Sequence, residues 1–146
     1  MKKEIWKDVP GYEGLYQVSN LGNVRSLNYR GRGKTHILSP GKDKKGYLHV
    51  SLFKDKNRTI VQIHRIVAIT FIPNPNNLPV VNHKDWNLGN NCVDNLEWCT
   101  FVYNSQYRKK ADILPGERKA VFDRYIKEHR IKQKVYNAEY YRKNSL

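Results

Sequence analysis

Alternating hydrophobic and polar positions, grouped in short segments, characterise the N-terminal half of the chain. Residues 15–18 and 23–27 show this pattern on either side of Ser-Asn-Leu-Gly, a sequence that suits a four-residue hairpin connection. Residues 46–53 (GYLHVSLF) and 58–65 (RTIVQIHR) alternate in the same way and are rich in β-branched and aromatic side chains. The pattern predicts two antiparallel β-hairpins, separated by the basic, glycine-rich arm NYRGRGKTH.

The periodicity changes after the second hairpin. Residues 63–72 (IHRIVAITFI) are apolar at most positions and precede Pro73, which predicts a short buried helix that ends at the proline. Two further strands are predicted at 80–83 (VVNH) and 96–100 (LEWCT), and Thr100 is a suitable N-cap for a helix that begins at the next residue. The predicted order in this region is strand, asparagine-rich loop, strand, helix.

These elements predict an α+β fold in three segments. Residues 1–60 form a β-rich module of small antiparallel hairpins, residues 61–110 form a core with the strand, strand, helix order, and residues 111–146 form a helical C-terminal tail with many charges. A length of 146 residues suits one domain, or a compact core with a short appended module, and excludes a large multidomain enzyme.

Charge changes the picture, because 27 Lys and Arg against 13 Asp and Glu give a net charge of +14. A polyanion is the expected partner, although a generally solvated basic surface is the alternative. Residues 25–65 carry 11 basic and 2 acidic side chains, whereas residues 75–100 carry one basic and three acidic ones. The N-terminal module is therefore predicted to provide phosphate contacts to a nucleic-acid partner. The candidate residues are Arg25, Arg30, Arg32, Lys34, Lys42, Lys44, Lys45, Lys54, Lys56 and Arg58.

Neither a membrane segment nor a cysteine framework is expected. No apolar run approaches the length of a membrane span, and Glu4 and Asp8 lie where a signal peptide would need an apolar stretch, so a cytoplasmic protein without a membrane partner is predicted. Two cysteines are too few for a disulfide framework or a four-cysteine zinc site.

The most unusual composition lies in residues 80–104, VVNHKDWNLGNNCVDNLEWCTFVYN, with six asparagines, two aspartates and one histidine. Hydrolysis of a phosphodiester needs a base to activate water and a hard divalent cation with oxygen ligands. His83 is a candidate base, and Asn82 and Asn104 can bracket one cation with their amide oxygens, provided that the strand ends or twists near His83. Asn95, just before the second strand, can hold the loop backbone and so fix the direction of His83.

A resemblance rests on these residues. The arrangement N-H-K-D-x-N, then N-N-x-x-x-N-L-E-W-x-T, then an Asn in the following helix, resembles the HNH (ββα-metal) nucleases, particularly the phage and group I intron homing endonucleases. The upstream I-H-R-I-V-A-x-x-F-I-P-N-P also matches, and WKDVPGYEGLYQVSNLGNVRSL resembles the short module that commonly precedes the HNH motif in them. The resemblance covers most of residues 4–107.

The resemblance implies a metal-dependent DNA endonuclease in which His83 is the general base and Asn95 positions it through the loop. Asn104 and Asn82 fall at the ligand positions of one divalent cation, Mg²⁺ or Mn²⁺. Because other members carry Asp where this chain has Asn82, we expect a weaker grip on the cation. Asp85 is interpreted first as a brace of the loop and second as an additional ligand.

Other polar and aromatic residues of the segment receive simpler interpretations. Trp86 stands where the family usually has Gly, which predicts an altered turn or an exposed stacking ring. Asn87, Asn90 and Asn91 are interpreted as turn formers, because asparagine tolerates left-handed backbone and bonds its own main chain. The histidines other than His83 are interpreted as structural.

One HNH motif supplies one hydrolytic centre, so the expected enzyme is a monomer or weak dimer that nicks one strand of double-stranded DNA. If it is encoded by a phage, it acts in the host-cell cytoplasm. The alternative is a catalytically weak or inactive HNH-fold DNA-binding protein, in which Asn82 has cost metal affinity. The joint presence of His83, Asn95 and Asn104 argues against that alternative. An RNA-binding protein would account for the charge but not for the asparagines.

Overall fold

The computed structural model describes residues 2–110. Within this range, residues 2–74 together with 79–99 form one compact unit, and residues 75–78 together with 100–110 belong to a second. The predicted helical tail lies outside the described residues. Antiparallel sheets with few helices confirm the predicted α+β class.

The first sheet has four antiparallel strands in the order β1-β2-β3-β4, and β1 (Trp6–Asp8) pairs with β2 (Tyr16–Ser19). β2 pairs in turn with β3 (Val24–Ser26), which together form the first predicted hairpin, and β3 pairs with β4 (His36–Ile37). Because β1 and β4 span only three and two residues, they are too short to display an alternating pattern.

The second sheet is the predicted second hairpin with one added strand. β5 (Gly41–Lys42) pairs with β6 (Leu48–Lys54), and β6 pairs with β7 (Asn57–Gln62). The register brings Lys54 opposite Asn57, so only Asp55 and Lys56 form the turn, both at positive φ. Two consecutive residues with positive φ are typical of the tight turns that match the twist of a hairpin. The basic arm before this sheet contains the short 3-10 helix η1 (Tyr29–Gly31).

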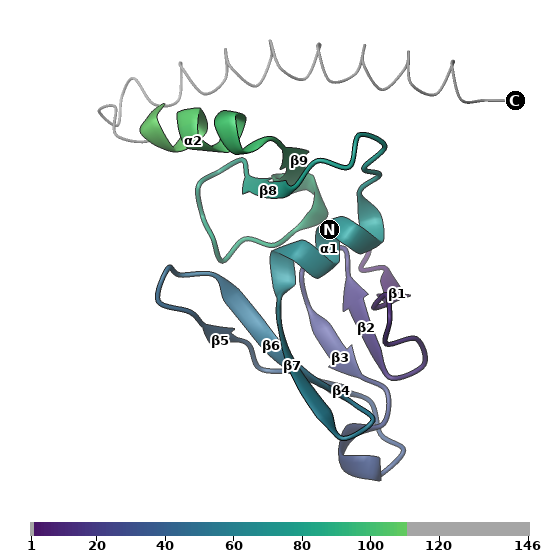
Figure 1. Cartoon of the computed structure of the whole chain (residues 1–146). Coiled ribbons are helices and arrows are strands. Elements are labelled where there is room, and N and C mark those ends of the chain that lie inside the picture. Colours follow the sequence, from purple (N-terminus) through teal and green to yellow (C-terminus); the bar gives the residue numbers. More distant parts are fainter. Residues whose placement is uncertain (1, 111–146) are drawn as a thin grey trace, which may run out of the picture. The chain divides into compact units, whose positions relative to one another are not determined.

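Helix α1 (Ile63–Phe71) begins directly after β7 and ends before Pro73, as predicted. Ile63, Val67 and Ala68 are buried on one side, whereas Ile69 on the other is half exposed. α1 contacts β2, β6, β7, β8 and β9, so it lies between the N-terminal sheets and the following strand pair (Figure 1).

The asparagine-rich loop joins the two strands of the third sheet. β8 (Val80–His83) and β9 (Leu96–Cys99) pair in antiparallel fashion, and the 3-10 helix η2 (Val93–Asn95) leads into β9. In the second unit, α2 (Phe101–Lys110) begins after Thr100, whose Oγ1 accepts a hydrogen bond from the Tyr103 backbone N–H at 3.1 Å. This bond is the predicted N-cap.

One hydrophobic core joins the three sheets and α1 of the first unit. Its buried members come from the β1–β3 region, from β6, from α1 and from both strands of the third sheet: Val9, Val18, Val24, Val50, Leu52, Ile63, Ile66, Val67, Ala68, Val81 and Leu96. The core crosses residue 60, where we predicted the boundary of the N-terminal module. The strand pair that carries His83 is therefore held by apolar contacts from both sides of that boundary.

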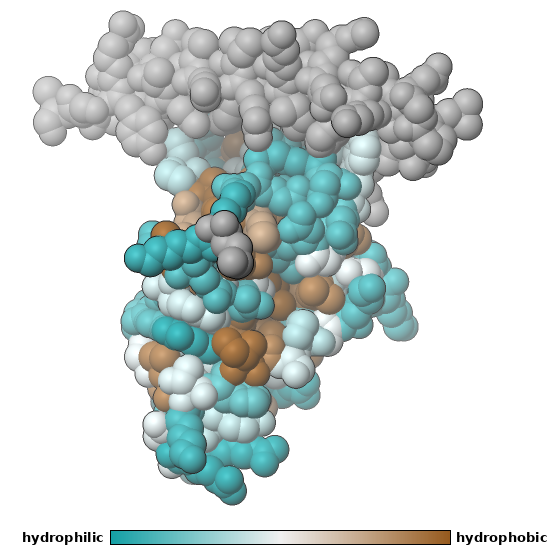
Figure 2. All heavy atoms as spheres, turned by 180° about the vertical axis from the view of Figure 1, so that it is seen from behind, coloured by the Kyte–Doolittle hydropathy of each residue, from teal (hydrophilic) through white to brown (hydrophobic). Residues whose placement is uncertain are grey.

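The face shown in Figure 2 is mainly hydrophilic or neutral, with hydrophobic side chains in separate small groups. The large hydrophobic side chains that are exposed on the sheets include Ile37, Phe53 and Ile60. No helix among residues 2–110 is long and apolar enough to cross a membrane.

Candidate active site

His83 is the last residue of β8 and lies opposite Leu96 of β9. Its side chain is only 3 % exposed, and its Nε2 lies 2.9 Å from Oδ1 of Asn91. With the amide oxygen as acceptor, Nε2 carries the proton and the lone pair of the imidazole is on Nδ1. The ring thus has a fixed tautomer and a basic nitrogen that does not face Asn91.

Burial lowers the pKa of His83 below the usual 6.5, while the Asn91 hydrogen bond and the Asp85 charge oppose this shift. The lowered pKa means that the imidazole is neutral at pH 7, which is the protonation state that a general base requires.

Asn91 has a larger part in the site than the sequence indicated. We interpreted Asn91 as a turn former, but its side chain is 3 % exposed and directed at the His83 ring. Asn87 and Asn90 do behave as turn formers, because their Oδ1 atoms accept backbone N–H bonds from Gly89 at 3.0 Å and Cys92 at 3.4 Å. Burial distinguishes Asn91 from its neighbours, and no local pattern reveals it.

Asn95 closes the loop between β8 and β9. Its Oδ1 accepts the Asp85 backbone N–H at 3.0 Å, and its Nδ2 donates to Asp85 Oδ1 and to the Asn90 carbonyl, both at 2.8 Å. The backbone carbonyl of Asn95 also accepts the Lys84 N–H at 2.8 Å. These bonds connect the residues just after His83 with the residues just before β9. The loop backbone is therefore held at both ends by one side chain.

Asp85 is the acceptor at the centre of this network. Its Oδ1 accepts from Asn95 and from the Asn87 backbone N–H at 2.8 Å, and its Oδ2 accepts from Asn90 Nδ2 at 2.7 Å. Although partial burial opposes ionisation, the bonds from Asn90, Asn87 and Asn95 hold the pKa of Asp85 below its usual value. Both oxygens are engaged within the loop, which fits a brace better than a metal ligand.

Asn82 is 5 % exposed and lies opposite Glu97 in the strand register. Its Nδ2 donates to Glu97 Oε1 at 2.9 Å, which fixes the amide and directs its Oδ1 to the other side. The sequence did not single out Glu97, because its importance arises only from its pairing with Asn82. Asn104 lies in the first turn of α2, where its backbone N–H donates to the Thr100 carbonyl at 3.0 Å.

A second histidine lies against His83. The ring centroids of His64 and His83 are 5.1 Å apart, and the Tyr47 ring lies 4.9 Å from His64 and 6.0 Å from His83. His64 is 5 % exposed, and among residues 2–110 its Nδ1 has no hydrogen-bond partner. Burial, with smaller effects of His83 and Arg65, lowers the pKa of His64 to about 3. His64 is therefore a neutral member of the wall behind His83.

Trp86 occupies the position where the family usually has glycine, and its backbone keeps the left-handed conformation, with φ of 60°. The backbone N–H of Trp86 donates to the His83 backbone carbonyl at 3.2 Å. The turn is thus the one that a glycine would favour, and the ring is half-buried. We had expected an altered turn or an exposed ring.

The donor chemistry of the site fits a hard cation held loosely. Among residues 2–110 no group of three or more His, Cys, Asp or Glu side chains is arranged to hold a metal ion. The amide oxygen of Asn82 is a hard, neutral donor of the kind that Mg²⁺ and Mn²⁺ accept. The bond to Glu97 satisfies this buried amide and also fixes the direction of its oxygen, as an oriented ligand would require.

The predicted DNA-binding residues are distributed over β3, the η1 arm and the β5–β7 sheet. Within residues 2–110, the side chains of Arg25, Lys54 and Arg58 donate hydrogen bonds, and Arg30 lies over the Tyr29 ring. Arg25 donates to Gln17 Oε1 at 3.0 and 2.7 Å. Arg58 donates to Ser51 Oγ at 3.0 and 2.9 Å, and Lys54 Nζ to the Gly11 carbonyl at 2.8 Å. Lys42, Lys44, Lys45 and Lys56 lie on exposed strand ends and turns.

Comparisons with known proteins agree with this architecture. Residues 4–53 match the family model of the NUMOD4 motif, and the similar curated proteins are named as HNH or DNA endonucleases. The chain is therefore of the HNH homing-endonuclease type, with a NUMOD4 motif at its N-terminal end, and the resemblance recognised in the sequence is confirmed.

More particularly, the chain is similar to DNA endonuclease I-HmuI of Bacillus phage SP01, with 46% identity over 99 residues, which are 68% of this chain and 54% of that protein. An uncharacterized HNH endonuclease of Acanthamoeba polyphaga mimivirus is 38% identical over 86% of this chain and 31% of its own length. The chain spans about half or less of these relatives. The solved structure titled "DNA binding and cleavage by the HNH homing endonuclease I-HmuI" aligns with a TM-score of 0.63 and 39% identity, covering 80% of this chain and 65% of that one.

Proposed function

We propose that this protein is a metal-dependent DNA endonuclease that hydrolyses a phosphodiester bond of double-stranded DNA. The observation that carries the proposal is the buried, neutral His83 at the end of β8, aimed by Asn91 beside a loop that Asn95 braces. A histidine of fixed tautomer and lowered pKa at the edge of a polar loop is the arrangement expected of a general base. The endonuclease names of the similar proteins support the same activity.

In this mechanism His83 accepts a proton from the water that attacks the phosphorus. The bond from Asn91 Oδ1 keeps the proton on Nε2, so that Nδ1 is the basic nitrogen. Asn95 acts indirectly, because its side chain holds the loop that follows His83. The His64 and Tyr47 rings pack beside the His83 ring, with centroids 5.1 and 6.0 Å from it, and so limit its tilt.

Asn82 and Asn104 are the proposed ligands of one divalent cation, Mg²⁺ or Mn²⁺. When bound, the cation supplies charge stabilisation for the phosphate and the leaving oxygen. Glu97 contributes by holding the amide of Asn82 in one orientation and by adding a negative charge nearby. Neutral amides bind Mg²⁺ more weakly than carboxylates do, so we expect half-maximal cleavage at a high cation concentration.

DNA binding is assigned to the basic N-terminal module. Arg30, Arg32, Lys34 and the lysines of the β5–β7 sheet are proposed to contact phosphates, which predicts affinity that falls steeply with salt. Arg25, Lys54 and Arg58 must exchange or share the partners described above when they contact DNA. With a single HNH element, the protein is proposed to nick one strand as a monomer.

Cleavage of supercoiled plasmid tests the proposal. The wild type, His83→Ala and a control, His49→Ala in β6, are incubated with Mg²⁺, Mn²⁺ or EDTA, with a library of random inserts in the plasmid to supply many target sequences. Open circles that require both a metal and His83, but not His49, support a nicking endonuclease. Linear product would instead indicate paired cleavage events.

A wild type that retards the plasmid library in a gel but leaves it uncut with either cation would contradict the proposal. That outcome would favour the HNH-fold DNA-binding protein. Equal cleavage by the wild type and His83→Ala would remove His83 from the mechanism while leaving the endonuclease activity in place.

A further inference from the structure

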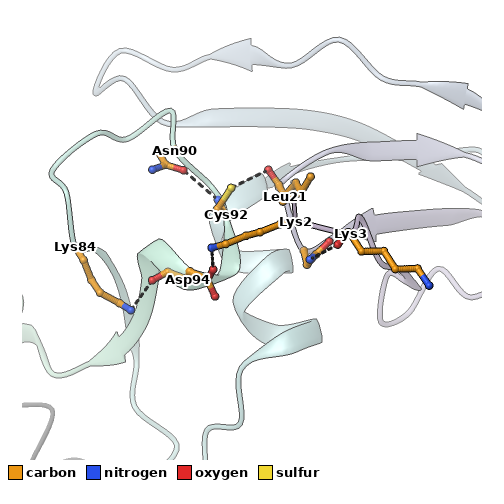
Figure 3. A network of polar contacts seen from close by, with 8 residues as sticks. Lys2, Lys3, Leu21, Lys84, Asn90, Cys92 and Asp94 are labelled. Atoms are coloured by element: carbon orange, nitrogen blue, oxygen red, sulfur yellow. Dashed lines mark hydrogen bonds and ion pairs between the residues drawn. The ribbon is translucent and has the colours of Figure 1, made fainter.

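The turn between β2 and β3 of the N-terminal module contacts the loop of residues 84–95, which we call the catalytic loop because it follows His83. The Val93 backbone N–H donates to the Asn20 carbonyl at 2.9 Å, and Cys92 Sγ lies 3.6 Å from the Leu21 carbonyl. Figure 3 shows the segment 90–94 lying against Leu21, with Asp94 paired to Lys2. Two parts of the chain about 70 residues apart in sequence thus meet through their backbones. We refer to residues 19–23, which join β2 to β3, as the 19–23 turn.

The 19–23 turn is itself fixed from inside. Ser19 is fully buried, and its Oγ accepts the backbone N–H groups of Leu21 at 3.2 Å and Asn23 at 3.1 Å. The Gly22 N–H donates to the Ser19 carbonyl at 3.0 Å. A turn with so many internal bonds is a firm surface, so whatever packs on it is held in place.

Gly22 is the point of closest approach. A Cβ at this position would lie 2.8 Å from Asn91 Cβ and 3.0 Å from both the carbonyl carbon and the carbonyl oxygen of Asn91. Two of these atoms are backbone, which cannot swing aside as the end of a side chain can. The 19–23 turn therefore meets the catalytic loop at Asn91, whose Oδ1 is 2.9 Å from His83 Nε2.

We propose that Gly22 is a positioning residue for the cleavage reaction: the 19–23 turn holds the backbone of Asn91, and Asn91 in turn aims the ring of His83. This inference rests on the proposed role of His83 as the general base. It gives the NUMOD4 segment a part in the chemistry, in addition to DNA binding, because the segment supplies one wall of the catalytic loop.

The test compares two glycines with nearly equal backbone conformations. Gly22 has φ of +87° and Gly11 has φ of +84°, but a Cβ at Gly11 would meet nothing within 4 Å. Gly22→Ala and Gly11→Ala therefore share the conformational strain, and only Gly22→Ala pushes on Asn91. We expect Gly22→Ala to cleave about 10- to 100-fold more slowly in single turnovers at saturating DNA. DNA affinity is expected to match that of Gly11→Ala, whereas thermal stability should be lower in Gly22→Ala, because the added methyl group meets backbone atoms of Asn91.

A double-mutant cycle separates this role from a general loss of structure. Asn91→Ala removes the amide that contacts His83 but keeps the backbone on which Gly22 packs. If Gly22 acts through Asn91, adding Gly22→Ala to Asn91→Ala should slow cleavage by less than about twofold further. Multiplicative effects of the two substitutions would overturn the proposal.

A spectroscopic measurement does not depend on activity. In the full-length protein with ¹⁵N-labelled histidine, two-bond ¹H–¹⁵N spectra report the tautomer and hydrogen bonding of the His83 ring. The His83 signals are assigned as those that are missing from the spectrum of His83→Gln. Gly22→Ala should shift the His83 nitrogens, and Gly11→Ala should not. If they shift while no variant, the wild type included, cleaves DNA, the proposed function fails but the positioning stands. Unshifted signals with a wild-type rate would overturn the positioning.

If Gly22→Ala does not fold, Ser19→Ala loosens the same turn without adding an atom. Its control is Ser26→Ala, which removes another buried serine of the same sheet. Slower cleavage and shifted His83 nitrogens in Ser19→Ala alone would support the proposal. Equal behaviour of the two serine variants would count against it.

Discussion

The two strands of hairpin β6–β7 are connected by a short turn, whereas those of hairpin β8–β9 are connected by a long loop. β6 and β7 are connected by Asp55 and Lys56 alone, in a turn whose hydrogen bonds come from the strand ladder. β8 and β9 are connected by residues 84–95, whose backbone groups are bonded by the side chains of Asp85, Asn90 and Asn95. A long connection costs more conformational entropy to order, so this one needs its own side-chain network.

The comparison explains the composition of the two regions. The short turn tolerates charge, and its neighbours Lys54 and Arg58 remain near the surface. The long loop has to satisfy many polar backbone groups around a buried ring, and amides do so without adding charge beside His83. The asparagines therefore stabilise the conformation of the loop, and that conformation positions the residues of the candidate site.

The largest effect is expected at the residue that closes the long loop. Asn95→Ala removes the bonds to Asp85 and Asn90, which should slow cleavage about 100-fold and lower the free energy of unfolding by about 2 kcal/mol. Asn57→Ala, at the corresponding start of β7, should change stability by less than about 0.5 kcal/mol and leave the rate alone. Urea unfolding and single-turnover cleavage measure both. A similar loss of stability in Asn95→Ala and Asn57→Ala would contradict the proposed difference between the two connections.

A tenfold effect is expected at the pair Asn82 and Glu97. Asn82→Asp alone would put two carboxylates where an amide now donates to Glu97 Oε1 at 2.9 Å, so the gain of a charged ligand is offset by repulsion. Asn82→Asp combined with Glu97→Gln restores a donor and an acceptor. We expect only the double variant to lower the Mg²⁺ concentration for half-maximal cleavage, by about 10-fold. An equal gain from Asn82→Asp alone would show that Glu97 does not orient the ligand.

The pH dependence of cleavage tests the environment of His83. Because burial lowers its pKa below 6.5, and the base must be neutral, the rate should rise with pH at acidic values and reach its plateau before pH 7. The Asn91 hydrogen bond raises this pKa, so Asn91→Ala should move the rising limb to lower pH while reducing the plateau. Single-turnover rates between about pH 4.5 and 8.5 measure the limb. A midpoint above pH 7 in the wild type would contradict this environment.

The smallest effects concern backbone strain, which both hairpins contain. Lys56 has φ of 65° and Trp86 has φ of 60°, a region that glycine occupies without cost. Lys56→Gly should stabilise the protein by up to about 1 kcal/mol. Because Lys56 is a proposed phosphate contact, the substitution should also weaken DNA binding, while the single-turnover rate at saturating DNA stays unchanged. Trp86→Gly relieves the same strain but removes a half-buried ring, so its net stability change should be smaller. Thermal unfolding of both variants compares their stability changes. A larger gain in stability for Trp86→Gly than for Lys56→Gly would contradict this prediction.

Local signals explain which elements were predictable. Pro73 ends α1, and Thr100 caps α2, because both effects act within a few residues. β1 was not predicted, because Trp6–Asp8 is a strand only through its pairing with β2 and shows no strand pattern of its own. The role of Asn91 depends on its contacts with His83 and Gly22, and no spacing in the sequence encodes them. His83, Asn95 and Asn104 were singled out by the resemblance and by their residue types, and their catalytic roles stay predictions.

The hydrophobic core has a consequence for how such proteins diversify. Val18 and Val24 of the N-terminal sheet belong to the same hydrophobic core as Val81 and Leu96, which lie in the strands on either side of the loop of residues 84–95. A segment exchanged between relatives at residue 60 would have to bring matching partners for these side chains, or leave cavities under the nuclease element. For a protein with the proposed function, a new target preference would thus arise more easily through substitutions on the exposed hairpins than through recombination at residue 60.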